Sequence, residues 1–222
     1  MINLVGIAFG MKCLHARRII HRDLKPDNVL LNEQLHPKIT DFGLSKIQYD
    51  NQQSISEEGT AYYMAPEIIL GESNFTNSVD VYAFAILAYE VITLQKLYPK
   101  IRNVFQLMNE IPKGIRPKFP DDTNPKLVEL VTRCWDHQDT ARPTFEEIFE
   151  LLKNPEYLID GVDIDEYNEY TNSLEDDVKS LCLSPEVKSI VDQADKGDTE
   201  KMLRAANGFY DGNGEFPFNQ DE

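Results

Sequence analysis

The sequence predicts a mainly α-helical domain with short β-hairpins, followed by a separate C-terminal helical segment. Residues 79–93 are apolar on nearly every side, and a helix with that pattern is buried. Residues 1–16 carry apolar side chains at intervals of three and four, which predicts a helix with one buried face. Short apolar runs at 29–31 and 38–40 flank a turn-rich connection, and together they predict a β-hairpin.

The middle of the chain predicts three more helices. A short one is expected over 101–110. Asn124 followed by Pro125 predicts the start of the next, because proline is well tolerated at the first helical position. Thr144 with Glu147 three residues later forms a capping box, which predicts the start of the third.

The composition indicates a soluble globular protein, and its negative charge disfavours binding to anionic partners. The chain has 222 residues, of which 41% are hydrophobic, and a net charge of −16. This charge argues against binding to nucleic acid or anionic lipid. No stretch approaches the roughly 20 apolar residues that cross a bilayer, so no membrane insertion is expected. Cys13, Cys134 and Cys182 lack metal-ligand spacing, which indicates reduced thiols and a cytoplasmic location.

Acidic residues are concentrated towards the C-terminus. Residues 155–222 carry 18 acidic and 5 basic side chains, and such a shift marks a second compositional region. We therefore expect a folded domain at 1–154, an acidic linker with at most one short helix at 155–184, and a partial helical repeat or helical tail at 185–222.

Two motifs carry the chemistry of the chain. HRDLKPDN stands at 21–28, and DFG follows at 41–43. Together they resemble the catalytic loop and the metal-binding turn of protein kinases. GTAYYMAPE at 59–67 is similar to the end of the activation segment of serine/threonine kinases. SVDVYAF at 78–84 resembles the tyrosine-kinase-like group of these enzymes. The resemblance covers residues 1 to 154 and implies the large lobe of a kinase domain.

The resemblance implies a role for each polar residue of the site. Asp23 accepts or orients the proton of a substrate hydroxyl that attacks the γ-phosphate of ATP. Lys25 helps to bind ATP and neutralises charge on the transferred phosphoryl group. Asn28 and Asp41 supply the hard oxygen ligands that Mg²⁺ prefers. The implied reaction is phosphoryl transfer from Mg-ATP to serine or threonine hydroxyls of protein substrates.

Regulation by phosphorylation is implied by the residue beside the base. Arg22 carries a guanidinium that can bind a phosphate group through two hydrogen bonds. Kinases with this arginine are often switched by phosphorylation of the activation segment. The candidate sites are Ser54, Ser56 and Thr60, of which Thr60 is the weakest because its kinase counterpart more often positions the substrate.

Three residues far from the loop in sequence are expected to support it. The resemblance implies a buried ion pair between Glu67 and Arg142. Asp80 is expected to cap the N-terminus of its own helix. By resemblance, Asp80 also bonds the backbone of the loop at 21–28.

The small lobe of a kinase is absent from this sequence. Twenty residues precede His21, and they contain neither a glycine-rich loop nor a strand with the ATP-binding lysine. Three interpretations stay open: an N-terminally truncated kinase, a catalytically inactive binding module or decoy, and a repeat-type scaffold with a vestigial kinase part. We favour the first, because a decoy does not need an intact site, and four site residues are intact here: Asp23, Lys25, Asn28 and Asp41.

The segment 185–222 shows a helical pattern of its own. Its order A-x-x-G-D, M-x-x-x-A and Y-x-G-x-G resembles the first helix of a Sel-like repeat, a relative of the tetratricopeptide repeat. The resemblance implies protein partners that bind through this repeat. The alternative is an acidic helical tail.

Overall fold

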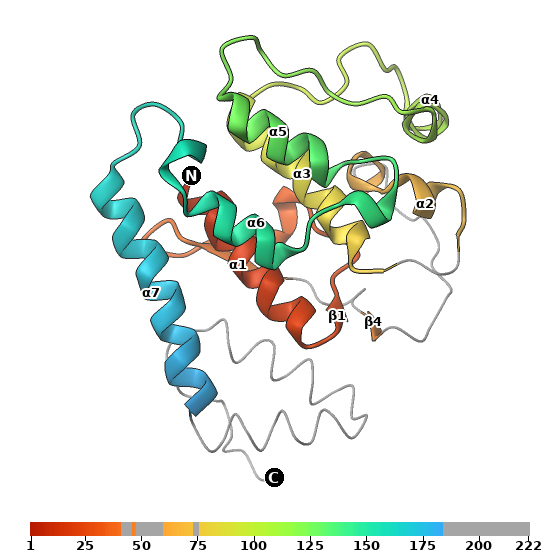
Figure 1. The fold of residues 1–222 in the computed structure, drawn as a ribbon. Coiled ribbons are helices and arrows are strands. Elements are labelled where there is room, and N and C mark those ends of the chain that lie inside the picture. Colours follow the sequence, from red (N-terminus) through yellow and green to blue (C-terminus); the bar gives the residue numbers. More distant parts are fainter. Residues whose placement is uncertain (41–45, 48–59, 73–75, 184–222) are drawn as a thin grey trace. The chain divides into compact units, whose positions relative to one another are not determined.

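The computed structural model describes the backbone of residues 1–40, 46–47, 60–72 and 76–183, and side chains of most of these up to residue 176 (Figure 1). Contacts divide the chain into two units, residues 1–168 and 169–222. The first unit contains the site and all of the elements described below, except that the last helix continues beyond residue 168. The segment 185–222, where a partial repeat is predicted, lies outside the described residues.

The core of the first unit forms around two long helices. Helix α3 (Ser78–Thr93) is buried at every position from Val79 to Tyr89, as its apolar sequence predicts. Helix α1 (Ile2–Ala16) confirms the predicted N-terminal helix and packs along α6 (Phe145–Leu152) (Figure 1). The rings of Phe9 and Phe149 lie 5.2 Å apart across this contact.

The predicted helix starts at Asn124 and Thr144 are confirmed. Asn124 accepts a hydrogen bond from the amide of Lys126 at 2.8 Å and begins α5 (Pro125–Cys134). Thr144 accepts from the amide of Glu147 at 3.2 Å, and the Glu147 carboxylate accepts from the amide of Thr144 at 2.8 Å. This reciprocal capping begins α6 where the sequence predicts it.

Two small antiparallel sheets flank the loop at 21–28. Strands β2 (Val29–Leu31) and β3 (Pro37–Ile39) form the predicted hairpin, although β3 begins one residue early. Strands β1 (Ile19–Ile20) and β4 (Lys46–Ile47) also pair, and the sequence did not predict them as strands. Runs of two residues are too short to show a strand period, so only the tertiary structure reveals this pair.

Two predicted boundaries differ from the structure. Helix α4 (Val104–Glu110) begins three residues later than predicted, because the side chain of Asn103 caps it by accepting from the amide of Gln106 at 2.9 Å. The expectation of at most one short helix in 155–184 is wrong, since α7 (Ile164–Leu183) has 20 residues.

Helix α7 is anchored at its start. The side chain of Asp163 accepts hydrogen bonds from the amides of Asp165 and Glu166, both at 3.0 Å. Tyr167 is buried and donates its hydroxyl to the carbonyl of Leu152 at 2.9 Å. This cap and this aromatic anchor explain why an acidic segment of weak periodicity begins a long helix.

The remaining elements are short. They are η1 (Pro26–Asn28), η3 (Thr60–Tyr63), α2 (Pro66–Ile69), η4 (Ile111–Lys113), η5 (Asp139–Ala141) and η6 (Pro155–Tyr157). Helix therefore predominates, as the sequence predicts. Among the described residues, no helix has the length and apolar character that a bilayer span requires.

Candidate active site

The loop at 21–28 brings three predicted site residues into direct contact. The ammonium of Lys25 lies 2.9 Å from Oδ2 of Asp23. The amide nitrogen of Asn28 donates to the same oxygen at 2.9 Å and to the backbone carbonyl of Asp23 at 2.7 Å. Each of the three residues is less than a tenth exposed, at 7% for Asp23, 8% for Lys25 and 5% for Asn28. One carboxylate oxygen thus holds the loop together.

The other carboxylate oxygen of Asp23 is left open. Oδ1 is buried and has no hydrogen-bond partner within the described part of the chain. A buried acceptor without a donor is costly, and such an atom in a native structure calls for a functional explanation. Because Oδ2 is already occupied, Oδ1 is the oxygen that can accept a proton or a hydrogen bond from a bound molecule.

The backbone of the loop is anchored by the carboxylate of Asp80 on α3. Oδ2 accepts from the amide of His21 at 2.8 Å, and Oδ1 accepts from the amide of Arg22 at 2.8 Å. Nε2 of His15 on α1 also donates to Oδ2 at 2.8 Å. Arg22 has a φ of 70°, a left-handed conformation that is uncommon outside glycine. The two hydrogen bonds from these backbone amides to Asp80 hold the loop in this strained conformation.

The expectation that Asp80 caps its own helix is wrong. Both carboxylate oxygens of Asp80 face the loop amides, and Asn77 stands at the N-cap of α3 without a side-chain cap bond. Instead, Oγ1 of Thr76 accepts from the amide of Ser78 at 3.3 Å.

The environment of Asp80 favours its charged form. Burial by itself would raise the pKa of this carboxyl group. The hydrogen bond from His15, the electrostatic interactions with His15 and His21 and the hydrogen bond from the amide of Arg22 outweigh burial, so the pKa of Asp80 is lowered overall. Asp80 is therefore ionised when the loop is folded at neutral pH.

Replacing Asp80 by alanine is expected to lower the free energy of unfolding by about 3 kcal/mol, because two buried loop amides lose their acceptor. Since the folded-state pKa of Asp80 is depressed, its contribution is present above the unfolded value of about 3.9 and is lost as the pH falls through the folded value. Denaturant unfolding of wild type and Asp80→Ala should therefore show a stability difference that shrinks below about pH 4. Asp122→Ala, at an exposed carboxylate, is the control and should change little. A difference that stays constant with pH would contradict this account.

His21 connects the loop to the strand that precedes Asp41. Its Nδ1 accepts from the amide of Asp23 at 3.3 Å, and its Nε2 donates to the carbonyl of Thr40 at 3.0 Å. The amide of Thr40 also donates to the carbonyl of Asn28 at 2.8 Å. Thr40 is thereby held against the loop, and Asp41 follows it directly in the chain.

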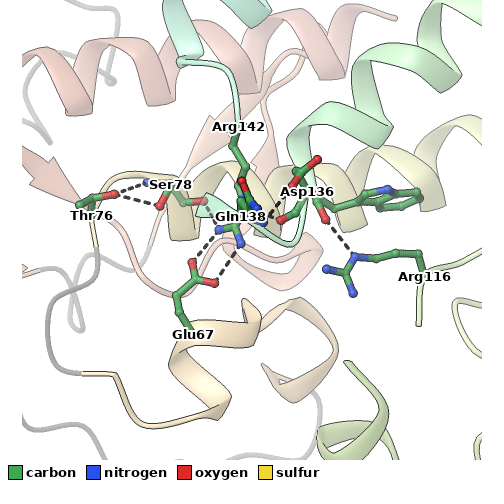
Figure 2. A network of polar contacts seen from close by, with 8 residues as sticks. Glu67, Thr76, Ser78, Arg116, Asp136, Gln138 and Arg142 are labelled. Atoms are coloured by element: carbon green, nitrogen blue, oxygen red, sulfur yellow. Dashed lines mark hydrogen bonds and ion pairs between the residues drawn. The ribbon is translucent and has the colours of Figure 1, made fainter. Parts of the chain in front are cut away.

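A second anchor joins two segments that lie 75 residues apart in sequence. Nη1 and Nη2 of Arg142 donate to the two carboxylate oxygens of Glu67, at 2.6 Å and 2.9 Å (Figure 2). Arg142 also donates to the carbonyls of Asp136 and Ser78, both at 3.0 Å. Its guanidinium lies 5.2 Å from the ring centroid of Tyr82. This network ties the start of α2 to the segment that leads into α6.

The comparisons with known proteins decide the family. A model for the protein tyrosine and serine/threonine kinases matches residues 2–152. The chain belongs to the protein kinase family. The region of the kinase match contains the loop at 21–28 and both anchors described above.

The curated relatives of this kinase chain include proteins of Arabidopsis thaliana and Dictyostelium discoideum. Serine/threonine-protein kinase STY17 of Arabidopsis thaliana is 38% identical over 148 residues, which cover 67% of this chain and 26% of the relative. Dual specificity protein kinases shkD and shkA of Dictyostelium discoideum are 35% and 38% identical over 204 and 167 residues. These alignments cover 90% and 72% of this chain, and 26% and 31% of the relatives. The chain thus spans about a quarter to a third of the length of these kinases.

Several predicted residues of the kinase site fall outside the part that the structure describes. Asp41, Ser54 and Ser56 lie outside the described residues, and Thr60 opens η3 with a side chain that is likewise not described. Their roles stay predictions.

The structure also adds two groups that sequence reasoning missed. His15 holds Asp80, and Tyr63 donates to Glu90 at 2.6 Å. Burial raises the pKa of Tyr63 and that of Glu90, although the hydrogen bond itself opposes the rise at Glu90. His15 follows Met11 by four residues and so lies on the apolar face of α1. A polar residue on that face is a sequence signal for a buried hydrogen-bond partner.

Proposed function

We propose that this chain provides the catalytic and metal-binding residues of an ATP-dependent protein serine/threonine kinase. The observation that carries the proposal is the arrangement of Asp23. Lys25 and Asn28 occupy its Oδ2, whereas its buried Oδ1 has no partner in the described residues. A scaffold gains nothing from an open, buried carboxylate oxygen, whereas a base requires one.

The chemistry of the proposed step is direct phosphoryl transfer. The hydroxyl oxygen of a serine or threonine forms a bond to the γ-phosphorus of ATP, and the bond from that phosphorus to the β–γ bridging oxygen breaks. ADP leaves, and the hydroxyl proton passes to Oδ1 of Asp23. The ammonium of Lys25, 2.9 Å from Oδ2 of Asp23, supplies positive charge next to the transferred group.

The residues of the loop fit a hard cation. Asn28 uses its amide nitrogen for both bonds to Asp23, and its carbonyl oxygen accepts no hydrogen bond from any residue that the structure describes. Amide and carboxylate oxygens are suitable Mg²⁺ ligands, so Asn28 and Asp41 would hold the ion. Mg²⁺ would neutralise charge on the phosphates of ATP when bound.

The preference for serine and threonine rests on two supports. Lys25 followed by Pro26 resembles serine/threonine kinases, and the relative STY17 carries that name. The shk relatives are named dual specificity kinases, so tyrosine is the alternative acceptor.

We propose further that phosphate on Ser54, Ser56 or Thr60 is bound by Arg22 and orders the activation segment. We also propose that the kinase acts on protein substrates in the cytoplasm, where the thiols of its three cysteines would stay reduced.

A chimera tests the proposed function. The 222 residues contain no glycine-rich loop, so the small lobe of a complete serine/threonine kinase would be joined before Met1. The chimera would be assayed with Mg-ATP and casein. We expect the chimera to phosphorylate serine and threonine at least about 100 times faster than the 222-residue chain alone, because positioning of the phosphates supplies much of this catalysis. Phosphoamino-acid analysis identifies the acceptor.

Two results would count against the proposal. The first is a chimera that unfolds cooperatively and binds nucleotide yet transfers no phosphate, which would favour the binding module. The second is a 222-residue chain that transfers phosphate as fast as the chimera, which would contradict the need for a small lobe.

A further inference from the structure

A cavity of about 370 Å³ lies within the first unit, away from the residues of the proposed active site. It is bordered by the end of α1, the start of α3 and the segment 139–146 that leads into α6. None of Asp23, Lys25 and Asn28 lines it. Its volume is in the range of small-molecule sites. Thr76, Ser78 and Arg142, which belong to the network of Figure 2, form part of its wall.

The cations on the wall of the cavity are already neutralised. Arg142 pairs with Glu67. Lys12 lies 2.9 Å from a carboxylate oxygen of Glu146 and 4.0 Å from one of Glu150. A bound anion would therefore have to displace an existing partner, which argues against an anionic ligand.

Two further ionisable groups line the cavity, and they determine whether it favours a cationic or an anionic ligand. His15 bonds the ionised Asp80. Asp139 also lines the cavity, and it forms no ion pair or side-chain hydrogen bond with any residue in the described ranges. It is a carboxylate without a counterion, so the wall favours a cation.

Part of the wall is suited to an apolar group. Ala16, Val81, Pro143 and Phe145 line the cavity. The ring of Phe145 meets the ring of His15 edge to face, with centroids 5.0 Å apart. A site that combines apolar side chains with a few polar groups, here one carboxylate that is not ion-paired within the described residues, has the usual composition of a small-molecule site.

We propose that this cavity binds a small amphipathic cation, an aryl- or alkylamine, whose ammonium group pairs with Asp139 and whose apolar part contacts Pro143 and Phe145. Binding is communicated to the loop at 21–28, because His15 lines the cavity and holds the carboxylate that fixes the amides of His21 and Arg22. A ligand packed against His15 stabilises this chain of hydrogen bonds. The binding itself does not depend on the proposed kinase function.

Benzylamine is the probe, and benzyl alcohol is its neutral counterpart. Titrations of the 222-residue chain, followed by amide resonances, should show benzylamine binding about five times more tightly than benzyl alcohol, since the ion pair is only partly buried. Asp139→Asn should remove this difference in affinity and lower the affinity for benzylamine by about the same factor. Asp121→Asn, at an exposed carboxylate that does not line the cavity, should leave it unchanged.

Ala16→Phe gives a second test, because Ala16 lines the cavity at the exposed end of α1 and a larger side chain there would occupy part of the cavity. It should abolish binding of both probes. Equal affinities for benzylamine and benzyl alcohol, or full binding to Asp139→Asn, would overturn the assignment. The comparison of the two probes on the wild-type chain stands even where a variant fails to fold.

Hydrogen exchange tests the connection to the loop without an assay of activity. At saturating benzylamine, the amides of His21 and Arg22 should exchange at least about threefold more slowly, because the bonds to Asp80 open less often. Asp139→Asn at the same concentration should show no slowing. Unchanged exchange of both amides at saturation would disprove the communication, whereas inactivity of the kinase chimera would leave this result untouched.

Discussion

Asp23→Asn is expected to lower phosphoryl transfer by the kinase chimera by about 10²- to 10⁴-fold, the contribution of a positioned general base. The substitution is nearly isosteric. Its carbonyl oxygen can still accept from Lys25 and Asn28, as Oδ2 of Asp23 does at 2.9 Å in both cases. Only the open Oδ1 is replaced, by an amide nitrogen that accepts no proton.

The measurement separates this loss from a loss of structure. Steady-state kinetics should show a lower kcat with a nucleotide affinity that stays within about twofold, because Asn28 and Lys25 keep their positions. Asp23→Ala should lower kcat further, because Lys25 and Asn28 both lose the oxygen atom that they bond. The control is Asp121→Asn, which should retain the full rate. An Asp23→Asn chimera that keeps more than about a tenth of the rate would show that Asp23 is not the base.

Arg142→Leu is expected to lower the free energy of unfolding by about 3–5 kcal/mol, because it leaves the carboxylate of Glu67 buried without a cation. The side chain of Arg142 is fully buried, and that of Glu67 is 9% exposed. The carbonyls of Asp136 and Ser78 lose a donor as well. Denaturant unfolding followed by circular dichroism measures the loss.

A double-mutant cycle tests whether the loss of stability comes from the broken ion pair between Arg142 and Glu67. Arg142→Leu combined with Glu67→Leu should destabilise the chain by clearly less than the sum of the two single changes, since no unpaired charge remains. Arg133→Leu, at an exposed arginine of α5, should change stability by less than about 0.5 kcal/mol. Additive losses at Glu67 and Arg142 would mean that the pair itself carries no coupling.

Local patterns made much of the fold predictable. The helix at 2–16 and the starts at Asn124 and Thr144 depend on side chains within one or two turns of each other. Such interactions are visible in a short window of sequence. The start of α4 at Val104 was missed even though its cap, Asn103, is equally local, so that error was one of interpretation.

Other features depend on residues that are distant in the chain. Asp80 is of a residue type that often caps helices, and it lies in the first turn of α3, yet its oxygens bond amides 58 and 59 residues away. The strand pair β1 and β4 likewise depends on contacts outside any short window, and so does the bond from the hydroxyl of Tyr167 to Leu152 that anchors α7. Propensity cannot choose between two hydrogen-bond partners when the better one is brought in by folding.

The sequence by itself determined the helical domain and the residue types of the site, because apolar periodicity and a fixed motif spacing are local properties. It also determined the family through the motifs at 21–28 and 59–67, which the match over residues 2–152 bears out. The family resemblance implied that Asp80 bonds the loop backbone, and the structure bears this out. Only the tertiary structure decided that Asp80 does not also cap its own helix, which oxygen of Asp23 is open and which charge on the cavity wall lacks a counterion. Each of these depends on which groups meet after folding, and a hydrogen bond of 2.8 Å between distant residues leaves no trace in the spacing of the chain.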